Sequence, residues 1–142
     1  MSHSDGLLSE VETLRRLRRH RADRAERALR EAKRAQQALL ANIQQAQDAL
    51  EHTRQEEALQ SARLLSQHQG QVLTLKALKS WGGQERSLSA NTRRDMGQLE
   101  ALQGQREEKQ TRVGTAQKQV TECLRQVEKL QELSLLLVQE PT

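Results

Sequence analysis

The strongest repeat in this chain runs from Leu99 to Leu137 and reads LEALQGQREEKQTRVGTAQKQVTECLRQVEKLQELSLLL. Counted in sevens, two positions of each heptad form a seam in which nine of twelve residues are apolar. The seam consists of Leu99, Leu102, Arg106, Lys109, Val113, Ala116, Val120, Cys123, Val127, Leu130, Ser134 and Leu137. Alternating spacings of three and four place these residues on one helical stripe. The pattern predicts a helix packed along a partner helix.

The composition argues against a rounded globular core. Of the 142 residues, 35% are hydrophobic and 30% charged, and Trp81 is the single aromatic side chain. Leu, Ala, Gln, Glu, Arg and Lys dominate, and these residues favour helix. The single proline, Pro141, interrupts no helix. We expect an all-α fold.

Nothing in the chain indicates catalysis. Cys123 is alone, the four histidines have no spacing that makes a metal face, and Gly82-Gly83 lacks a phosphate-loop motif. We therefore expect no enzyme activity, no metal and no cofactor. No apolar run approaches the roughly 18 residues of a membrane span, and the N-terminus lacks signal-peptide order. These features predict a cytoplasmic protein without a transmembrane segment.

The seam's partner is expected upstream in the same chain. An alanine-rich stripe repeats at three-four spacing through Ala25, Ala28, Ala32, Ala35, Leu39, Asn42, Ala46 and Ala49. After Thr53 the pattern slips and continues through Ala58, Ala62 and Leu65. Such a slip is a stutter, which alters supercoiling locally.

Two glycine sites compete for the turn between the helices. Gly70 is read as a glycine tolerated inside a helix, whereas paired glycines after Trp81 favour a stop. The sequence thus predicts one hairpin over residues 1–142: helix one about 7–80, turn about 81–87 and helix two about 88–138. The expected fold is an elongated antiparallel two-helix coiled-coil hairpin with a longer N-terminal helix.

A turn near residue 83 pairs residues whose numbers sum to about 166, by the symmetry of a hairpin. Arg106 and Lys109 then lie opposite Glu56 and Glu57, as a polar layer that fixes register. The same register leaves the first helix unpaired up to about Arg24, as a basic overhang.

The charge distribution singles out that basic end. The segment 15–34 holds ten basic and three acidic residues, whereas the whole chain carries only +4. Such a block suits nucleic acid, acidic lipid or an acidic protein surface. The lack of aromatic residues for base stacking argues against a single-strand binder. Trp81 either plugs the expected turn or anchors a partner.

The segment LRRLRRHRADRAERA, residues 14–28, resembles the arginine-alanine opening of the FliJ/YscO family. Members are small coiled-coil stalk proteins of bacterial type III secretion and flagellar export. The resemblance implies a non-enzymatic stalk and adaptor that binds the hexameric secretion ATPase and links it to the export gate protein, peripheral to the inner-membrane apparatus. It also implies secretion chaperones as partners.

Carried onto this sequence, the resemblance assigns two sets of binding residues. The ATPase side consists of Arg15, Arg16, Arg18, Arg19, Arg21 and Arg24, and the export-gate side of Leu75, Leu78 and Trp81. A general coiled-coil scaffold, or a chaperone-binding protein, is the alternative. A basic nucleic-acid binder ranks last, and no specific nucleic acid is expected.

Overall fold

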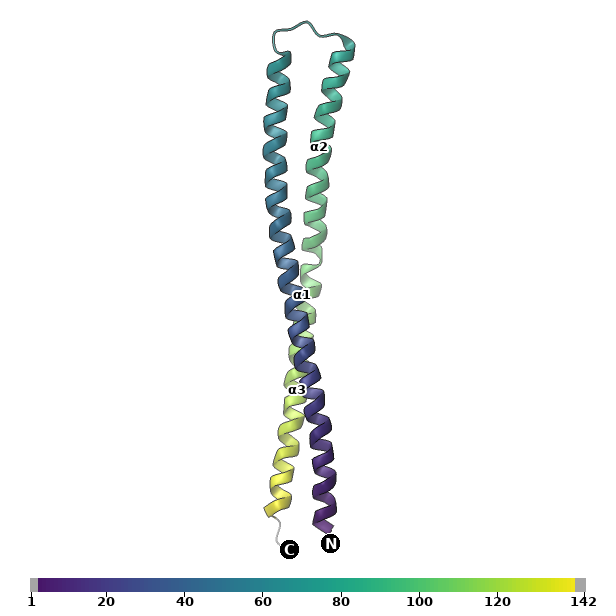
Figure 1. Cartoon of the computed structure of the whole chain (residues 1–142), viewed down its shortest axis with the longest axis vertical. Helices are drawn as coiled ribbons and strands as arrows, with labels where there is room; N and C mark the ends of the chain where they lie inside the picture. Colours follow the sequence, from purple (N-terminus) through teal and green to yellow (C-terminus); the bar gives the residue numbers. More distant parts are fainter. Residues whose placement is uncertain (1–2, 140–142) are drawn as a thin grey trace. The chain divides into compact units, whose positions relative to one another are not determined.

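The computed structural model describes residues 3–139, in which α-helix is the only regular secondary structure (Figure 1). Helix α1 spans His3–His68, α2 spans Leu75–Gly104 and α3 spans Arg106–Gln139. The predicted all-α helical hairpin is therefore confirmed. None of the helices, within the described residues, is long and apolar enough to cross a membrane. Pro141 lies outside the described residues.

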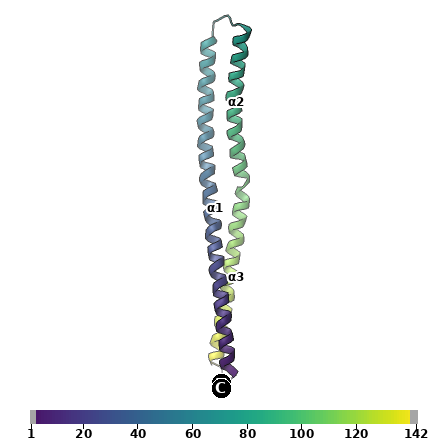
Figure 2. The same ribbon diagram turned by 45° about the vertical axis from the view of Figure 1, so that its right-hand side comes forward.

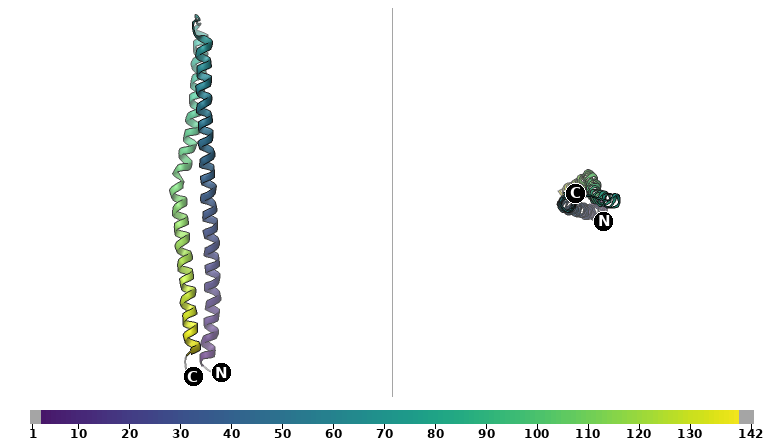
Figure 3. Two further views of the ribbon diagram at one scale, coloured as in Figure 1. Left: turned by 90° about the vertical axis from the view of Figure 1, so that its left-hand side faces the viewer. Right: turned by 90° about the horizontal axis from the view of Figure 1, so that it is seen from above.

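The chain divides into two compact units, each made of two antiparallel helical segments. Unit 1 pairs α1 up to Gln37 with α3 from Glu107 onward. Unit 2, residues 38–106, pairs the rest of α1 with α2. Within unit 2, α1 and α2 stay side by side when the molecule is turned (Figures 2 and 3).

Unit 1 is held by an apolar seam. Its buried side chains are Val11, Ala22, Val120, Val127 and Leu130. Each α3 position predicted for the seam from Lys109 to Leu137 is buried or half-buried, which confirms that part of the heptad pattern. Burying Val and Leu side chains contributes about 1.5–3 kcal/mol each, so these layers dominate the cohesion of unit 1. Arg106, in contrast, is exposed.

Unit 2 has an apolar seam over only part of its length. Leu39, Ile43 and Leu50 on α1 are buried, whereas α2, which the structure describes throughout, contains no buried residue. Beyond Leu50 the helices are joined by side-chain hydrogen bonds. Thr53 Oγ1 donates to Asp95, Thr92 Oγ1 donates to Glu57, and Ser61 Oγ donates to Glu85 at 2.9 Å.

The turn predicted at 81–87 is wrong, because the chain reverses between His68 and Leu75. Gly70 has φ +75°, a left-handed conformation that glycine adopts without a Cβ penalty. Thr74 then starts α2 as an N-cap, its Oγ1 accepting from the Ala77 backbone N–H at 3.1 Å. Gly70 is thus the helix-ending glycine that sequence analysis treated as tolerated, and helix one ends before residue 80.

Gly82 and Gly83 lie inside α2 instead of ending a helix. Each costs about 1 kcal/mol relative to alanine, which is not enough to break a helix that packs along a partner. With the turn moved, Glu57 meets Thr92, and the expected layer of Arg106 and Lys109 against Glu56 and Glu57 does not form.

The facing stripe of α1 also differs from the expected alanine stripe. Ala28, Ala35 and Ala49 are exposed, while Leu29, Ile43 and Leu50 face inward. The expected stutter after Thr53 is absent from this described part of α1. The three-four spacing continues through the half-buried residues Thr53, Glu57, Gln60, Leu64 and His68. Polar residues continue the inward-facing stripe of α1 at the same spacing, so a pattern that counts only apolar residues does not detect them.

The predicted basic overhang is wrong as well. Arg18 Nη1 donates to the Gln126 carbonyl oxygen at 2.9 Å, so the basic stretch of α1 packs along α3 within unit 1. The earlier turn makes residues 75–87 part of the returning arm, which lengthens that arm enough to cover the start of α1. The seam of α3 therefore clamps residues 3–37 instead of the expected stretch 29–67.

Candidate functional site

The arginines assigned to the ATPase side divide into two groups on α1. Arg15 and Arg18 are half-buried at seam positions, and Arg18 is bonded to α3. Arg16, Arg19, Arg21 and Arg24 are exposed. Only Arg15 and Arg16 approach a carboxylate, that of Glu12, each at 3.8 Å and in the described part of the chain. These exposed ion pairs contribute little stability, so four arginines remain available to a partner.

A shallow groove lies beside these arginines in unit 1. It is lined by Arg18, Arg21, Gln119, Glu122, Cys123 and Gln126. A second groove adjoins it where Ala25 and Ala28 face Ala116, because the small side chains leave space between the helices. Cys123 is a free, half-buried thiol in this seam, as its heptad position predicted. The surface combines guanidinium groups with a narrow apolar floor, which suits contact with an acidic protein surface.

The residues assigned to the export-gate side lie at the start of α2 in unit 2. Leu75 and Leu78 are 68% and 52% exposed. Trp81 is half-buried and is not in the turn. Its ring stacks on His68 of α1 with centroids 4.9 Å apart, and its Nε1–H donates to Glu85 Oε1 at 3.3 Å. The tryptophan therefore ties α2 to the end of α1, while the two leucines are free to contact a partner.

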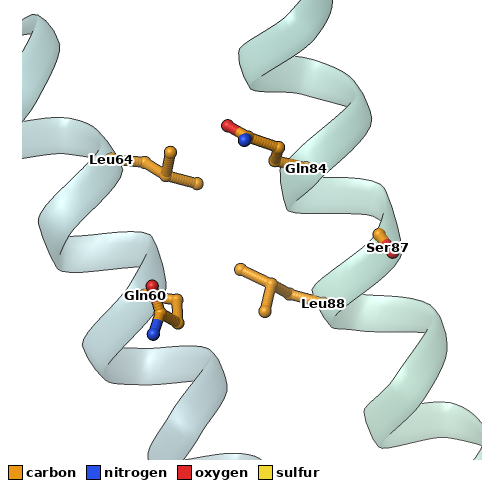
Figure 4. A pocket seen from close by; sticks show the side chains of 5 residues that line it. All are labelled: Gln60, Leu64, Gln84, Ser87 and Leu88. Carbon is orange, nitrogen blue, oxygen red and sulfur yellow. The ribbon is translucent and has the colours of Figure 1, made fainter.

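The seam behind Trp81 is loosely filled. Leu64 and Leu88 point toward one another across an open groove that Gln60, Gln84 and Ser87 also line (Figure 4). Two leucines without an aromatic neighbour bury little apolar area, so this part of unit 2 depends on polar contacts. The groove is open along its side and offers no enclosed cavity for a small ligand.

The site residues that the sequence analysis missed are polar ones. His68, Thr53 and Glu57 each bridge the two helices of unit 2, yet they carried no apolar signal. Continuing the three-four count from Leu50 would have reached all of them. Across the described residues no cluster of His, Cys, Asp and Glu is arranged to hold a metal ion.

The fold and surfaces define an all-α helical-hairpin protein with exposed charged and apolar side chains. The family model described as Type III secretion protein YscO matches residues 11–140. This match spans most of the chain, so the protein belongs to the YscO family of type III secretion proteins. No curated protein matches the chain, and no solved structure does.

Proposed function

We propose that this protein is a non-enzymatic central stalk and adaptor of a bacterial type III secretion system. It binds the hexameric secretion ATPase and links it to the export gate, at the cytoplasmic side of the inner-membrane apparatus. The observation that carries the proposal is the YscO family match, because it spans the arginine face of α1 and the start of α2 together.

The arginine face of unit 1 is the proposed ATPase contact. Arg16, Arg19, Arg21 and Arg24 are exposed on one continuous helix, and α3 holds that helix through Arg18 and the buried seam. A helix supported in this way contacts a symmetric ring asymmetrically. Different subunits of the ring then favour different states, which couples hydrolysis around the ring. Of the six arginines, Arg15 and Arg18 are half-buried at seam positions and are not part of the proposed contact.

The start of α2 is the proposed export-gate contact. Leu75 and Leu78 are exposed beside the loop 69–74, and Trp81 fixes the start of α2 against His68. Apolar side chains on a rigid helix are suited to bind a partner, because little conformational freedom is lost on binding.

The ATPase contact is tested by adding the protein to the purified secretion ATPase and measuring hexamer formation and hydrolysis. We expect both to rise with the wild-type chain. The double variant Arg19→Glu/Arg24→Glu removes the effect, because it reverses charge on the proposed face. Lys118→Glu/Lys129→Glu is the matched control: both lysines are exposed on α3, and the net charge changes equally.

Two outcomes would contradict the stalk role, and a third would contradict the arginine contact. If the wild-type chain leaves hexamer formation and hydrolysis unchanged, the proposal fails. A stable dimer in light scattering together with an unaffected ATPase favours a general coiled-coil scaffold instead. If both double variants lose the stimulation of the ATPase equally, net charge and not the arginine face causes that stimulation.

A further inference from the structure

The end of unit 2 is free of acidic residues. From Ala58 to Gln84 the sequence contains no Asp or Glu, but it contains Arg63, Lys76 and Lys79. All three cations are exposed. This stretch includes the end of α1, the loop 69–74 and the first turns of α2 (Figure 1). The stretch itself therefore carries only positive charge, and the neighbouring carboxylate of Glu85 accepts hydrogen bonds from Ser61 and Trp81.

The same end carries uncovered apolar side chains. Val72 in the loop is fully exposed, and Leu75 and Leu78 follow it along α2. Leu65 on the last turns of α1 is also exposed. On α2, Leu75 lies three residues before Leu78 and four before Lys79, and Lys76 lies three before Lys79, so cations and apolar groups share one side of the helix.

We propose that the loop end of unit 2 binds an anionic lipid surface. Val72, Leu75 and Leu78 enter the interface between headgroups and acyl chains. Leu75 and Leu78 also belong to the proposed export-gate contact, so lipid and the gate protein would compete for these two leucines. Lys76, Lys79 and Arg63 contact the anionic headgroups, and the lysines extend their ammonium groups outward while their methylene stems stay in the apolar layer. This combination of apolar side chains and nearby cations is the chemistry that holds peripheral proteins at membranes.

The exposure of these residues suits a lipid surface. Val72 is fully exposed, so no neighbouring side chain of this protein forms a groove around it and the loop end is a protruding surface. A protruding apolar residue fits a fluid surface, which moulds around it. The indole of Trp81 is bound to Glu85 and stacked on His68, so it supports this end without entering the lipid.

The test uses the full chain and vesicles alone, with neither ATPase nor gate protein present, so it fails or succeeds independently of the stalk proposal. Co-sedimentation is measured with phosphatidylcholine vesicles that contain or lack phosphatidylglycerol. We expect binding only to the anionic vesicles, weakened by salt. The fluorescence emission of Trp81, the single tryptophan, provides a second readout: it should change when the loop end binds the vesicles.

Two variants examine the two parts of the surface. Each cation near the membrane is worth about fivefold in affinity, so Lys76→Gln/Lys79→Gln should weaken binding about 25-fold. Val72→Ser/Leu75→Ser should weaken it about tenfold or more, through lost apolar burial. The control Lys118→Gln/Lys129→Gln makes the same charge change on α3 and should alter affinity less than twofold.

Several results would overturn the proposal. Absence of binding to anionic vesicles at low salt would leave this surface to a protein partner. Equal loss in the α3 control would reduce the effect to general charge attraction. If Arg19→Glu/Arg24→Glu abolishes binding while the loop-end variants retain it, the lipid contact lies on the arginine face of unit 1. Unchanged affinity of the serine variant would remove the apolar contribution.

Discussion

Units 1 and 2 use the same helical geometry but fill their seams with different chemistry. In unit 1, valine, alanine and leucine side chains from both helices are buried, and Arg18 adds one bond to the backbone of α3. In unit 2, only α1 contributes buried side chains, and hydroxyl–carboxylate bonds take over beyond Leu50. The difference separates two tasks: apolar layers supply cohesion, and polar layers specify which residues face each other.

The polar layers of unit 2 explain why its register is unambiguous despite its thin core. A thin apolar seam tolerates sliding, since leucine packs almost equally well against several neighbours. The bonds from Thr53, Ser61 and Thr92 are all made in one alignment and are lost together when either helix slips. We infer that unit 2 is less stable than unit 1 but that its polar layers fix the position of its loop end.

The largest expected effect comes from deleting an apolar layer of unit 1. Leu130 is 3% exposed, so Leu130→Ala should lower the free energy of unfolding by about 2–4 kcal/mol, through lost transfer energy and the cavity left behind. Leu136, 65% exposed on the same helix, is the control, and Leu136→Ala should change stability by less than about 0.5 kcal/mol. Urea denaturation followed by circular dichroism measures both. Equal losses would mean that the α3 seam is not the source of cohesion.

Two glycines, one in each unit, give a second contrast. Gly70→Ala forces a Cβ into a left-handed conformation and should destabilise the chain by about 1–2 kcal/mol. Gly114 lies inside α3, and among the described residues nothing lies within 4 Å of a Cβ added there. Gly114→Ala should therefore stabilise the chain by about 0.5–1 kcal/mol. Urea denaturation measures both changes in the free energy of unfolding. An unchanged stability of Gly70→Ala would contradict a turn that depends on the positive φ of Gly70.

The smallest expected effect concerns a single polar layer of unit 2. Thr92→Val removes the donor to Glu57 and should cost about 1 kcal/mol, because the half-buried carboxylate loses a partner. Thr121→Val is the matched control, since Thr121 Oγ1 donates only within its own helix, to the Gln117 carbonyl at 3.1 Å. A double-mutant cycle with Glu57→Gln isolates the coupling between the two side chains. Hydrogen exchange at α2 should accelerate in Thr92→Val alone. A coupling energy of zero would show that the layer does not specify register.

Much of this architecture could be read from local pattern. The heptad count from Leu99 identified the inward face of the returning arm, and Cys123, Val127 and Leu130 lie where it placed them. The turn could not be chosen in the same way. Gly70 and Gly82-Gly83 both carry a helix-ending signal, and their difference is too small to decide between them. Thr74, a strong N-cap type, was the overlooked local clue.

The candidate surfaces were predicted with similar limits. The basic stretch and the leucines near Trp81 were visible in the sequence, but their exposure was not. Arginine and tryptophan are common in binding sites, yet Arg18 and Trp81 both make contacts between the helices of this protein. Arg19 and Leu75 are free, and only packing separates these cases.

The sequence by itself determined the helical class, the inward face of α3 and the concentration of positive charge near the start of α1, because periodicity and composition act locally. Tertiary structure alone decided where the chain reverses and which residues face each other. The reversal at Gly70 lets Trp81 stack on His68 and Thr92 reach Glu57, and both contacts join α1 to α2. Their combined stabilisation selects one of two turns that local propensity leaves nearly equal.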